Sequence, residues 1–394
     1  MNVDNNNNKT LIVIVVQLPA KSTSAHIFGQ FQKPQFDWFH QTICHELYCV
    51  YFPCMKFEYT NEDLILQSSD TLSKFDKTLE SLWVDSYEGN RFRYKIDLSM
   101  KSLKKVSNGD VNILILPNDN RFSQRRKPQP FNDTDDQIAP ESFNFNKVST
   151  DEILLDIFEK QSTKSSFILI NVSPFSYLHS LLVPEMEECY NQVLRKQSLY
   201  LAIKCFLLSA NRYLCMGFNS LLAHASVNHM HFHFWQSPDY LRAMSTGIKR
   251  KYENLMYFEL VDHPVDNFVL ELSDLSELDN FINYLWTLIL SCQKLHIAHN
   301  LFVARSKSTG YMRVVVWPRC SAYGAKNISS VVSEAGFYVA VAELAGMMVV
   351  AGEDIASTLT YNKIESILRN ECLSRETMHL LENELFEALC VQQQ

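Results

Sequence analysis

The sequence predicts an α+β fold in which a mainly antiparallel sheet is flanked by helices and is duplicated or extended by a second α+β domain. Apolar residues make up 46% of the 394 residues and charged residues 20%, as in ordinary globular proteins. Strand-like segments occur in adjacent pairs between helical segments, which favours an antiparallel arrangement over a wound parallel sheet. The ten glycines form neither G-x-G-x-x-G nor G-x-x-x-x-G-K-[ST], so neither a dinucleotide fold nor a P-loop is expected.

Two domains, at residues 11–238 and 250–394, are expected after an asparagine-rich tail, residues 1–10, that is too polar to fold alone. In the first domain, Leu72, Phe75 and Leu79 recur at helical spacing, whereas alternating or buried-type apolar runs indicate strands. Its expected helices are residues 70–82 and 185–209, and its expected strands are residues 11–18, 91–98, 111–116, 166–172, 180–183, 213–218 and 225–235. The second domain is expected to contain strands 255–261, 268–272, 300–305 and 311–317, helices 275–293 and 334–350, and two C-terminal helices.

A segment of about thirty residues, 117–147, is rich in Pro, Asn, Asp, Gln and Ser and is longer than an ordinary connection. Such a loop is either functional or mobile. It contains a basic cluster, formed by Arg121, Arg125, Arg126 and Lys127. The cluster is either a solvated charge run or an anion-binding arm.

Charge and cysteine usage exclude several classes of protein. The 36 Lys and Arg against 44 Asp and Glu give a net charge of −8, which argues against nucleic acid as a partner but leaves room for a local basic pocket. The ten cysteines include no C-x-x-C pair, and the N-terminus lacks the features of a signal peptide. The longest apolar stretch, Gly336 to Gly352, is too short to cross a bilayer. We therefore expect a cytoplasmic protein without a membrane partner.

Three histidines at alternate positions, His229, His231 and His233, are separated by Met230 and Phe232. On a strand, the histidines would share one face and the apolar residues the other. The three imidazoles have three interpretations: side chains without a catalytic task, a zinc site, or a nucleophile for phosphorus. A strand of this length spans about 13 Å, too far for all three to reach one ion, although two could.

The segment from His229 to Trp235 resembles the histidine-triad signature, in which three histidines alternate with apolar residues. Longer blocks resemble the eukaryotic GDP-D-glucose phosphorylases and the plant GDP-L-galactose phosphorylases. These blocks are Gly217–Leu221, Ala225–His229, Asn171–Pro174, His179–Pro184, His299–Phe302, Val316–Arg319 and Glu343–Gly346. The resemblance covers about residues 85–390, and a histidine at position 233 argues against the related galactose-1-phosphate uridylyltransferases, which have Gln there.

The resemblance implies a histidine-triad-like sheet and an enzyme that converts GDP-glucose and phosphate into GDP and glucose 1-phosphate. His231 would form a GMP-histidine intermediate, His229 would orient it, and His233 would donate to a phosphoryl oxygen. His179 would lie near the phosphate or ribose. The residues expected to contact substrate are Asn219, Ser226, Arg121, Arg125, Arg319 and Lys326. No cofactor or metal is implied, and a homodimer is one possible assembly.

Two alternatives remain open at this point. A zinc-dependent hydrolase would use the same histidine segment as ligands. A catalytically silent GDP-sugar-binding protein would fit the change to Phe234 and Trp235, where the family often has Gly-Tyr or Leu-Tyr.

Overall fold

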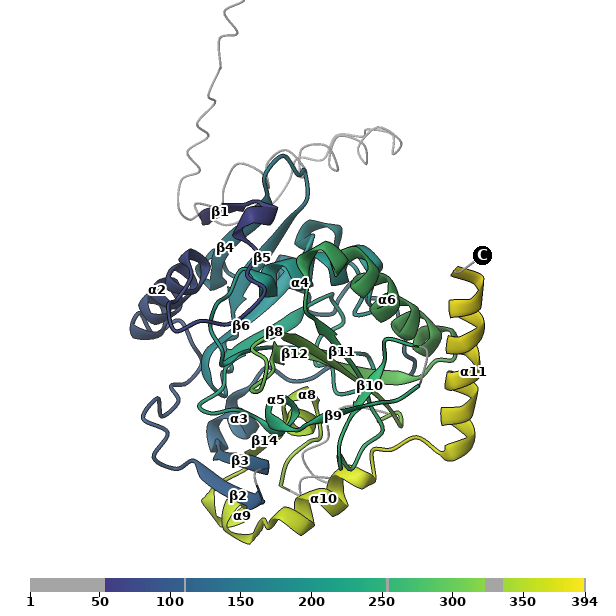
Figure 1. Ribbon diagram of the computed structural model, residues 1–394. Helices are drawn as coiled ribbons and strands as arrows, with labels where there is room; N and C mark the ends of the chain where they lie inside the picture. The colour runs from purple at the N-terminus through teal and green to yellow at the C-terminus, as the bar shows by residue number, and fades with distance from the viewer. Residues whose placement is uncertain (1–53, 110, 253–254, 323–335, 393–394) are drawn as a thin grey trace, which may run out of the picture. The chain divides into compact units, whose positions relative to one another are not determined.

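A large, mainly antiparallel sheet runs through the computed structural model, which describes residues 54–109, 111–252, 255–322 and 336–392 (Figure 1). Eleven strands of the described residues belong to it, and only β1 pairs in parallel, with β4. In sheet order they are β1 (Met55–Tyr59), β4 (Ile153–Glu159), β5 (Ser165–Ile170), β6 (Tyr177–Pro184), β8 (Phe232–Gln236), β7 (Leu214–Asn219), β12 (Ala298–Arg305), β13 (Met312–Arg319), β11 (Phe268–Leu272), β10 (Phe258–Leu260) and β9 (Ile248–Arg250). The predicted α+β class is confirmed.

One face of this sheet packs against long amphipathic helices. They are α2 (Lys74–Glu88), α4 (Lys196–Leu207), α6 (Leu278–Lys294) and α11 (Arg375–Gln392). Alternate residues of the histidine segment, Met230, Phe232 and Phe234, enter the core beneath them and are fully buried. The alternation of apolar residues with histidines therefore points the histidines away from this core.

The other face packs against a small sheet and short helices, visible in the lower half of Figure 1. The small sheet contains β14 (Met347–Val350), β3 (Val111–Pro117) and β2 (Lys104–Asn108), and the helices are α3 (Asp119–Gln124), α5 (Arg242–Ser245), α8 (Val341–Ala345), α9 (Glu353–Thr358) and α10 (Tyr361–Arg369). Gly217 of β7 allows α8 to approach, because a Cβ there would lie 2.6 Å from Cγ1 of Val341.

Short 3₁₀ turns complete the described elements. They are η1 (Asn61–Asp63), η2 (Phe145–Lys147), η3 (Thr150–Glu152), η4 (Met186–Glu188) and η5 (Leu275–Glu277). The two segments expected as separate domains contribute to the same sheet, since β7 pairs with β12 through Phe218 and Leu301. No helix among the described residues has both the length and the apolar character needed to cross a bilayer.

Most predicted elements of the described residues are found, but four are wrong. Residues 91–98 form turns, because the main chain of Ile96 bonds to the Tyr87 hydroxyl rather than to a strand. The helix expected over residues 185–209 forms only from Lys196, because Glu185 and Cys189 have left-handed backbone conformations. The elements predicted for residues 1–52 lie outside the described residues.

The other two errors fall beside the candidate site. The strand expected over residues 225–235 begins only at Phe232. Just before it, the side-chain amide of Gln192 forms the hydrogen bonds to the His231 main chain that a neighbouring strand would otherwise form. The helix expected over residues 334–350 is only α8, because Gly346 ends it with a φ of 109°. The apolar residues that follow Gly346 form β14 and pair in parallel with β3.

Candidate active site

His231 is held in one tautomer by the main chain next to it. Its Nδ1 lies 2.7 Å from the carbonyl oxygen of His229, which only accepts hydrogen bonds. Nδ1 therefore carries the proton and donates it, and the lone pair of the neutral ring is on Nε2. The residue is 3% exposed. This arrangement presents Nε2 of a neutral imidazole as a nucleophile.

A buried amide holds the main chain of His231 just before β8 begins. The His231 N–H donates to Oε1 of Gln192 over 2.8 Å, and Nε2 of Gln192 donates to the His231 carbonyl over 3.0 Å. The same Nε2 donates to the carbonyl of Asn219, at the end of β7, over 3.1 Å. Gln192 thus replaces the strand pairing that would otherwise fix this part of the histidine segment.

His233, inside β8, is paired with His179 of the neighbouring strand β6. Nδ1 of His179 accepts the main-chain N–H of Phe175 over 3.1 Å, so the proton of the neutral ring is on Nε2. This Nε2 lies 3.1 Å from Nδ1 of His233 and donates to it. Nδ2 of Asn171 lies 3.0 Å from the same Nε2, but the main-chain N–H of Phe175 sets the tautomer of His179. Neutral His233 therefore carries its proton on Nε2.

His179 stays neutral at physiological pH. Burial, followed by the nearby His233 and Arg121, holds the pKa of His179 well below its usual value of 6.5. A permanently neutral His179 can fix the tautomer of His233 without adding a second positive charge to the site.

The loop between α3 and β4 covers the histidine segment. The main-chain N–H of Phe145 donates to Nδ1 of His229 over 3.0 Å, and the Phe145 ring centroid lies 5.1 Å from that of His231. Burial, with a smaller contribution from His231, lowers the pKa of His229 to about 3, so this ring is neutral as well. His229 acts on His231 through its carbonyl oxygen.

Two arginines of the basic cluster bring positive charge to the histidines. Arg121 of α3 lies over the ring of Phe175, and Arg125, at the end of α3, lies over the ring of Tyr338, 5.3 Å from its centroid. Nε and Nη2 of Arg125 are buried without a hydrogen-bond partner among the described residues. Burial and the neighbouring Arg121 lower the pKa of Arg125 to about 10, so it remains a cation at neutral pH. A half-buried guanidinium whose buried N–H groups are unsatisfied favours an anionic ligand.

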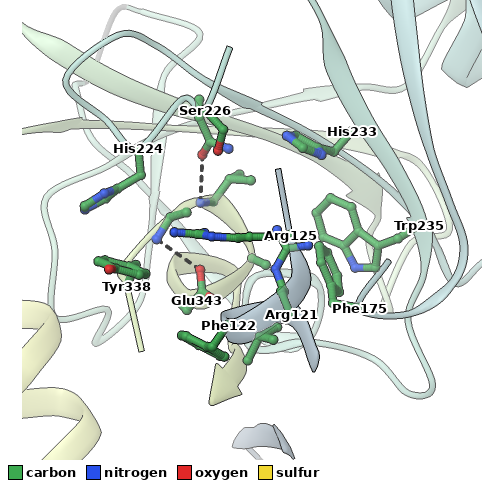
Figure 2. Close-up of a pocket in the computed structure, with 15 residues that line it drawn as sticks. Arg121, Phe122, Arg125, Phe175, His224, Ser226, His233, Trp235, Tyr338 and Glu343 are labelled. Carbon is green, nitrogen blue, oxygen red and sulfur yellow. Dashed lines mark hydrogen bonds between the residues drawn. The ribbon is translucent and has the colours of Figure 1, made fainter. Parts of the chain in front are cut away.

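Two adjacent cavities meet at this point, and both are lined by Arg121, Arg125, Ser226 and His233. The polar cavity, shown in Figure 2, is completed by Phe122, Phe175, Asn219, His224, Trp235, Tyr338, Ala340, Val341, Ala342, Glu343 and Val349. The apolar cavity is completed by Arg126, Phe145, Glu152, Leu169, Ile170, Asn171, Val172, Ser173, Leu181, Val227 and His231. The shared wall is therefore cationic, and His231 lines the apolar cavity.

Asn219 is oriented by a polar chain that leads to Arg319. Oδ1 of Asn219 accepts Nδ2 of Asn300 over 2.7 Å and the N–H of Val341 over 3.0 Å. Arg319 donates to Oδ1 of Asn300 over 3.2 Å and pairs with Glu371. Arg319 lines neither cavity and acts on the site through Asn300.

The structure brings together most residues expected at the site. His231, His233, Asn219, Ser226, Arg121 and Arg125 line the two cavities, and His229 and His179 are buried directly beside them. Lys326 lies outside the described residues.

Sequence reasoning missed Gln192, Phe145, Tyr338, His224 and Glu152. Gln192 and Tyr338 fall in segments that were expected to be helical, and Phe145 and Glu152 border a loop, so no periodicity pointed to them. Of these residues, His224 had a sequence feature that could have pointed to it, because it lies five residues before the first histidine of the triad segment.

One group of potential metal ligands occurs among the described residues, away from the triad. Asp133, Asp135 and His296 bring three ligand-type atoms within 4.8 Å of one another, and all three residues are exposed. In the structure Asp133 bonds to His296 over 3.1 Å, which ties the loop to the end of α6. At the triad, the Nδ1 atoms of His229, His231 and His233 are all taken by protein hydrogen bonds.

The fold and the histidine segment define a protein of histidine-triad-like fold. A solved structure with this fold is yeast Ap4A phosphorylase Apa2 in complex with AMP, with a TM-score of 0.53 and 13% identity, covering 79% of this chain and 99% of that one. Residues 74–235 match the family described as GDPGP1-like, N-terminal domain, and residues 241–392 match GDPGP1-like, C-terminal domain. The chain belongs to this GDPGP1-like family.

Relatives at higher identity confirm the predicted resemblance. GDP-D-glucose phosphorylase 1 of Danio rerio is 33% identical over 352 residues, which cover 85% of this chain and 99% of the relative. GDP-L-galactose phosphorylase 2 of Arabidopsis thaliana is 26% identical, covering 79% of this chain and 76% of the relative.

Proposed function

We propose that this chain is a GDP-D-glucose phosphorylase, which converts GDP-glucose and phosphate into GDP and glucose 1-phosphate. The observation that carries the proposal is the hydrogen bond from Nδ1 of His231 to the His229 carbonyl, since it puts the lone pair of the neutral ring on Nε2, in a cavity with a cationic wall. GDP-D-glucose phosphorylase 1 of Danio rerio matches over 99% of its own length, so its named activity is the activity proposed for this chain.

The two cavities fit the two parts of the substrate. The apolar cavity has Leu169, Val172 and Leu181 in its walls and can bury the nucleoside beside His231. The polar cavity, with Asn219 and the two arginines of the shared wall, suits the hexose phosphate and the incoming phosphate. This placement puts the α-phosphorus at the junction, within reach of His231.

The first step is an in-line displacement at the α-phosphorus. The Nε2 lone pair of His231 forms the N–P bond, and the bond from phosphorus to the bridging oxygen breaks, which releases glucose 1-phosphate. This leaving group has a second pKa near 6 and departs without a strong general acid. The N–H of His233 Nε2 can donate to a phosphoryl oxygen as charge develops. The His229 carbonyl stabilises the positive charge that His231 gains on attack.

The second step reverses the first with inorganic phosphate as the nucleophile. A phosphate oxygen attacks the α-phosphorus of GMP-His231, the N–P bond breaks, and the electron pair returns to Nε2. Phosphate has to be favoured over water, and Arg121 and Arg125 supply fixed donors for it. A cavity that holds phosphate in line therefore favours phosphorolysis over hydrolysis.

The test is incubation of the protein with GDP-glucose, with and without phosphate, followed by identification of the nucleotide products. GDP and glucose 1-phosphate formed only with phosphate support the proposal. GMP as the main product in the presence of phosphate would indicate a hydrolase, and binding without turnover would indicate a silent sugar-nucleotide-binding protein.

The cytoplasm is the compartment that we propose for this enzyme. All eight cysteines that the structure describes are free thiols, which suits a reducing environment.

A further inference from the structure

The apolar cavity contains a charged pair as well as the reacting histidine. Glu152 and Arg126 both line this cavity, and Glu152 supplies the one carboxylate among its described lining residues. Burying a carboxylate in a largely apolar pocket is costly, and the ion pair with Arg126 at 3.8 Å offsets that cost only in part. The carboxylate therefore needs a reason to be there.

The strand register sets how far Glu152 lies from the reacting groups. Glu152 ends η3, and the next residue, Ile153, begins β4. Ile153 pairs with Leu169, Leu169 with Leu181, and Leu181 with His233, so a row of residues crosses four neighbouring strands. Three strand spacings amount to roughly 14 Å. This is the main-chain separation of Ile153 and His233, so a nucleoside monophosphate that lies along the row with its phosphorus at the histidines would have its base near Glu152.

The ion pair with Arg126 does not use the hydrogen-bonding capacity of the Glu152 carboxylate. Nη2 of Arg126 lies 3.8 Å from Oε2 of Glu152, which is an ion-pair distance but too long for a hydrogen bond. The Glu152 and Arg126 side chains are 19% and 26% exposed, so both face a partly desolvated site. The guanidinium of Arg126 also lies over the ring of Phe143, with Cζ 3.5 Å from the ring centroid.

Guanine fits this pair better than the other common bases do. Its N1–H and N2–H₂ groups are neighbouring donors that a carboxylate accepts together, and its O6 and N7 are neighbouring acceptors that arginine binds. Adenine presents an unprotonated N1 to the carboxylate and an amino group in place of O6. Uracil is a single ring and does not fill the same length of cavity.

We infer that Glu152 and Arg126 recognise the base of the substrate, with Glu152 accepting N1–H and N2–H₂ of guanine and Arg126 donating to O6 and N7. This inference rests on the proposed function for the identity of the nucleotide. It makes the two residues specificity determinants of the same site.

Equilibrium binding of GMP and IMP tests this directly, because hypoxanthine lacks only the N2 amino group. We expect the wild-type protein to bind GMP at least about tenfold more tightly than IMP, because one good hydrogen-bonded contact to a base changes the affinity by about that factor. Glu152→Gln should bring the two dissociation constants within about threefold of each other, mainly by weakening GMP. Arg126→Met should weaken both nucleotides by a similar factor and leave their ratio unchanged, since both bases keep O6 and N7.

Asp151→Asn is the matched control, because Asp151 precedes Glu152 in η3, is exposed and loses the same charge. It should keep the wild-type ratio, and circular dichroism should show that all variants are folded. A GMP-to-IMP ratio in Glu152→Gln equal to that of the wild type would overturn the inference. Turnover of GDP-glucose is measured separately, so a failure of the proposed activity is distinguished from a failure of base recognition.

Discussion

Replacement of Arg125 by methionine is expected to stabilise the unliganded protein and to impair its activity at the same time. In the structure, Nε and Nη2 of Arg125 are buried without a hydrogen-bond partner among the described residues, and Arg121 adds a like charge nearby. Methionine fills much of the same volume without a charge. A change that improves the fold and harms the function identifies a residue kept for its ligand.

The magnitude follows from the contacts of the guanidinium. Each buried donor without a partner costs about 1–3 kcal/mol. The loss of the contact with the Tyr338 ring offsets about 0.5–2 kcal/mol of the gain. Two such donors cost about 2–6 kcal/mol, so after this offset we expect the free energy of unfolding to rise by about 2–4 kcal/mol in buffer free of phosphate. The wild type should in addition be stabilised by phosphate, by about 1.4 kcal/mol at ten times its dissociation constant, and the variant should not.

Urea unfolding with and without phosphate measures the first effect, and product analysis measures the second. Loss of a charge-assisted hydrogen bond should lower kcat/KM for phosphate by about 10–150-fold and shift products from GDP towards GMP, because water competes. Arg369→Met is the control, since this side chain is 66% exposed and should change neither quantity. A variant that is destabilised by more than 1 kcal/mol without phosphate, or that keeps the wild-type ratio of GDP to GMP, would refute the reasoning.

Four further predictions follow from the site. His231→Ala should abolish turnover but keep GDP-glucose binding within about threefold; activity within tenfold of wild type, about 1.4 kcal/mol in the barrier, would contradict a covalent intermediate. Gln192→Leu should lower kcat by about 100-fold with little change in KM, since the main chain of His231 loses its clamp; a loss below tenfold would show that the clamp is dispensable. Chelators should leave activity unchanged, and restoration of a chelated enzyme by zinc would overturn that expectation. Burial lowers the pKa of His229 to about 3 and that of His299 to about 4, and it also lowers the pKa of His179. The free energy of unfolding should therefore be highest above pH 6.5, and His229 and His299 should each take about 2 kcal/mol from it by pH 5; a pH-independent urea midpoint over this range would exclude it.

The sequence was informative where the pattern of residues is local. The alternation of the histidines with Met230, Phe232 and Phe234 correctly predicted one buried apolar face, and the 3–4 spacing around Phe75 correctly predicted α2. The family resemblance correctly predicted the histidine-triad-like fold and the family of the chain.

What the sequence did not reveal depends on contacts between distant segments. Gln192 holds His231 from 39 positions away, and a glutamine in a segment of mixed polar and apolar residues has no periodicity that distinguishes it. The apolar run after Gly346 has the composition of a buried helix, and only the pairing with β3 makes it a strand. Tertiary contacts override local propensity at both places.

The distribution of the cavity walls along the chain has a consequence for how this protein can change over evolutionary time. The polar cavity combines Arg125 and His233, which precede residue 240, with Tyr338 and Glu343, which follow it, and β7 and β12 join the two segments edge to edge. Neither half carries a complete polar cavity, so a gene fragment encoding only the histidine segment would lose part of its wall. The two halves are therefore not exchangeable modules. Recombination near residue 240 should be tolerated only when both parent genes encode chains with the same contacts between β7 and β12.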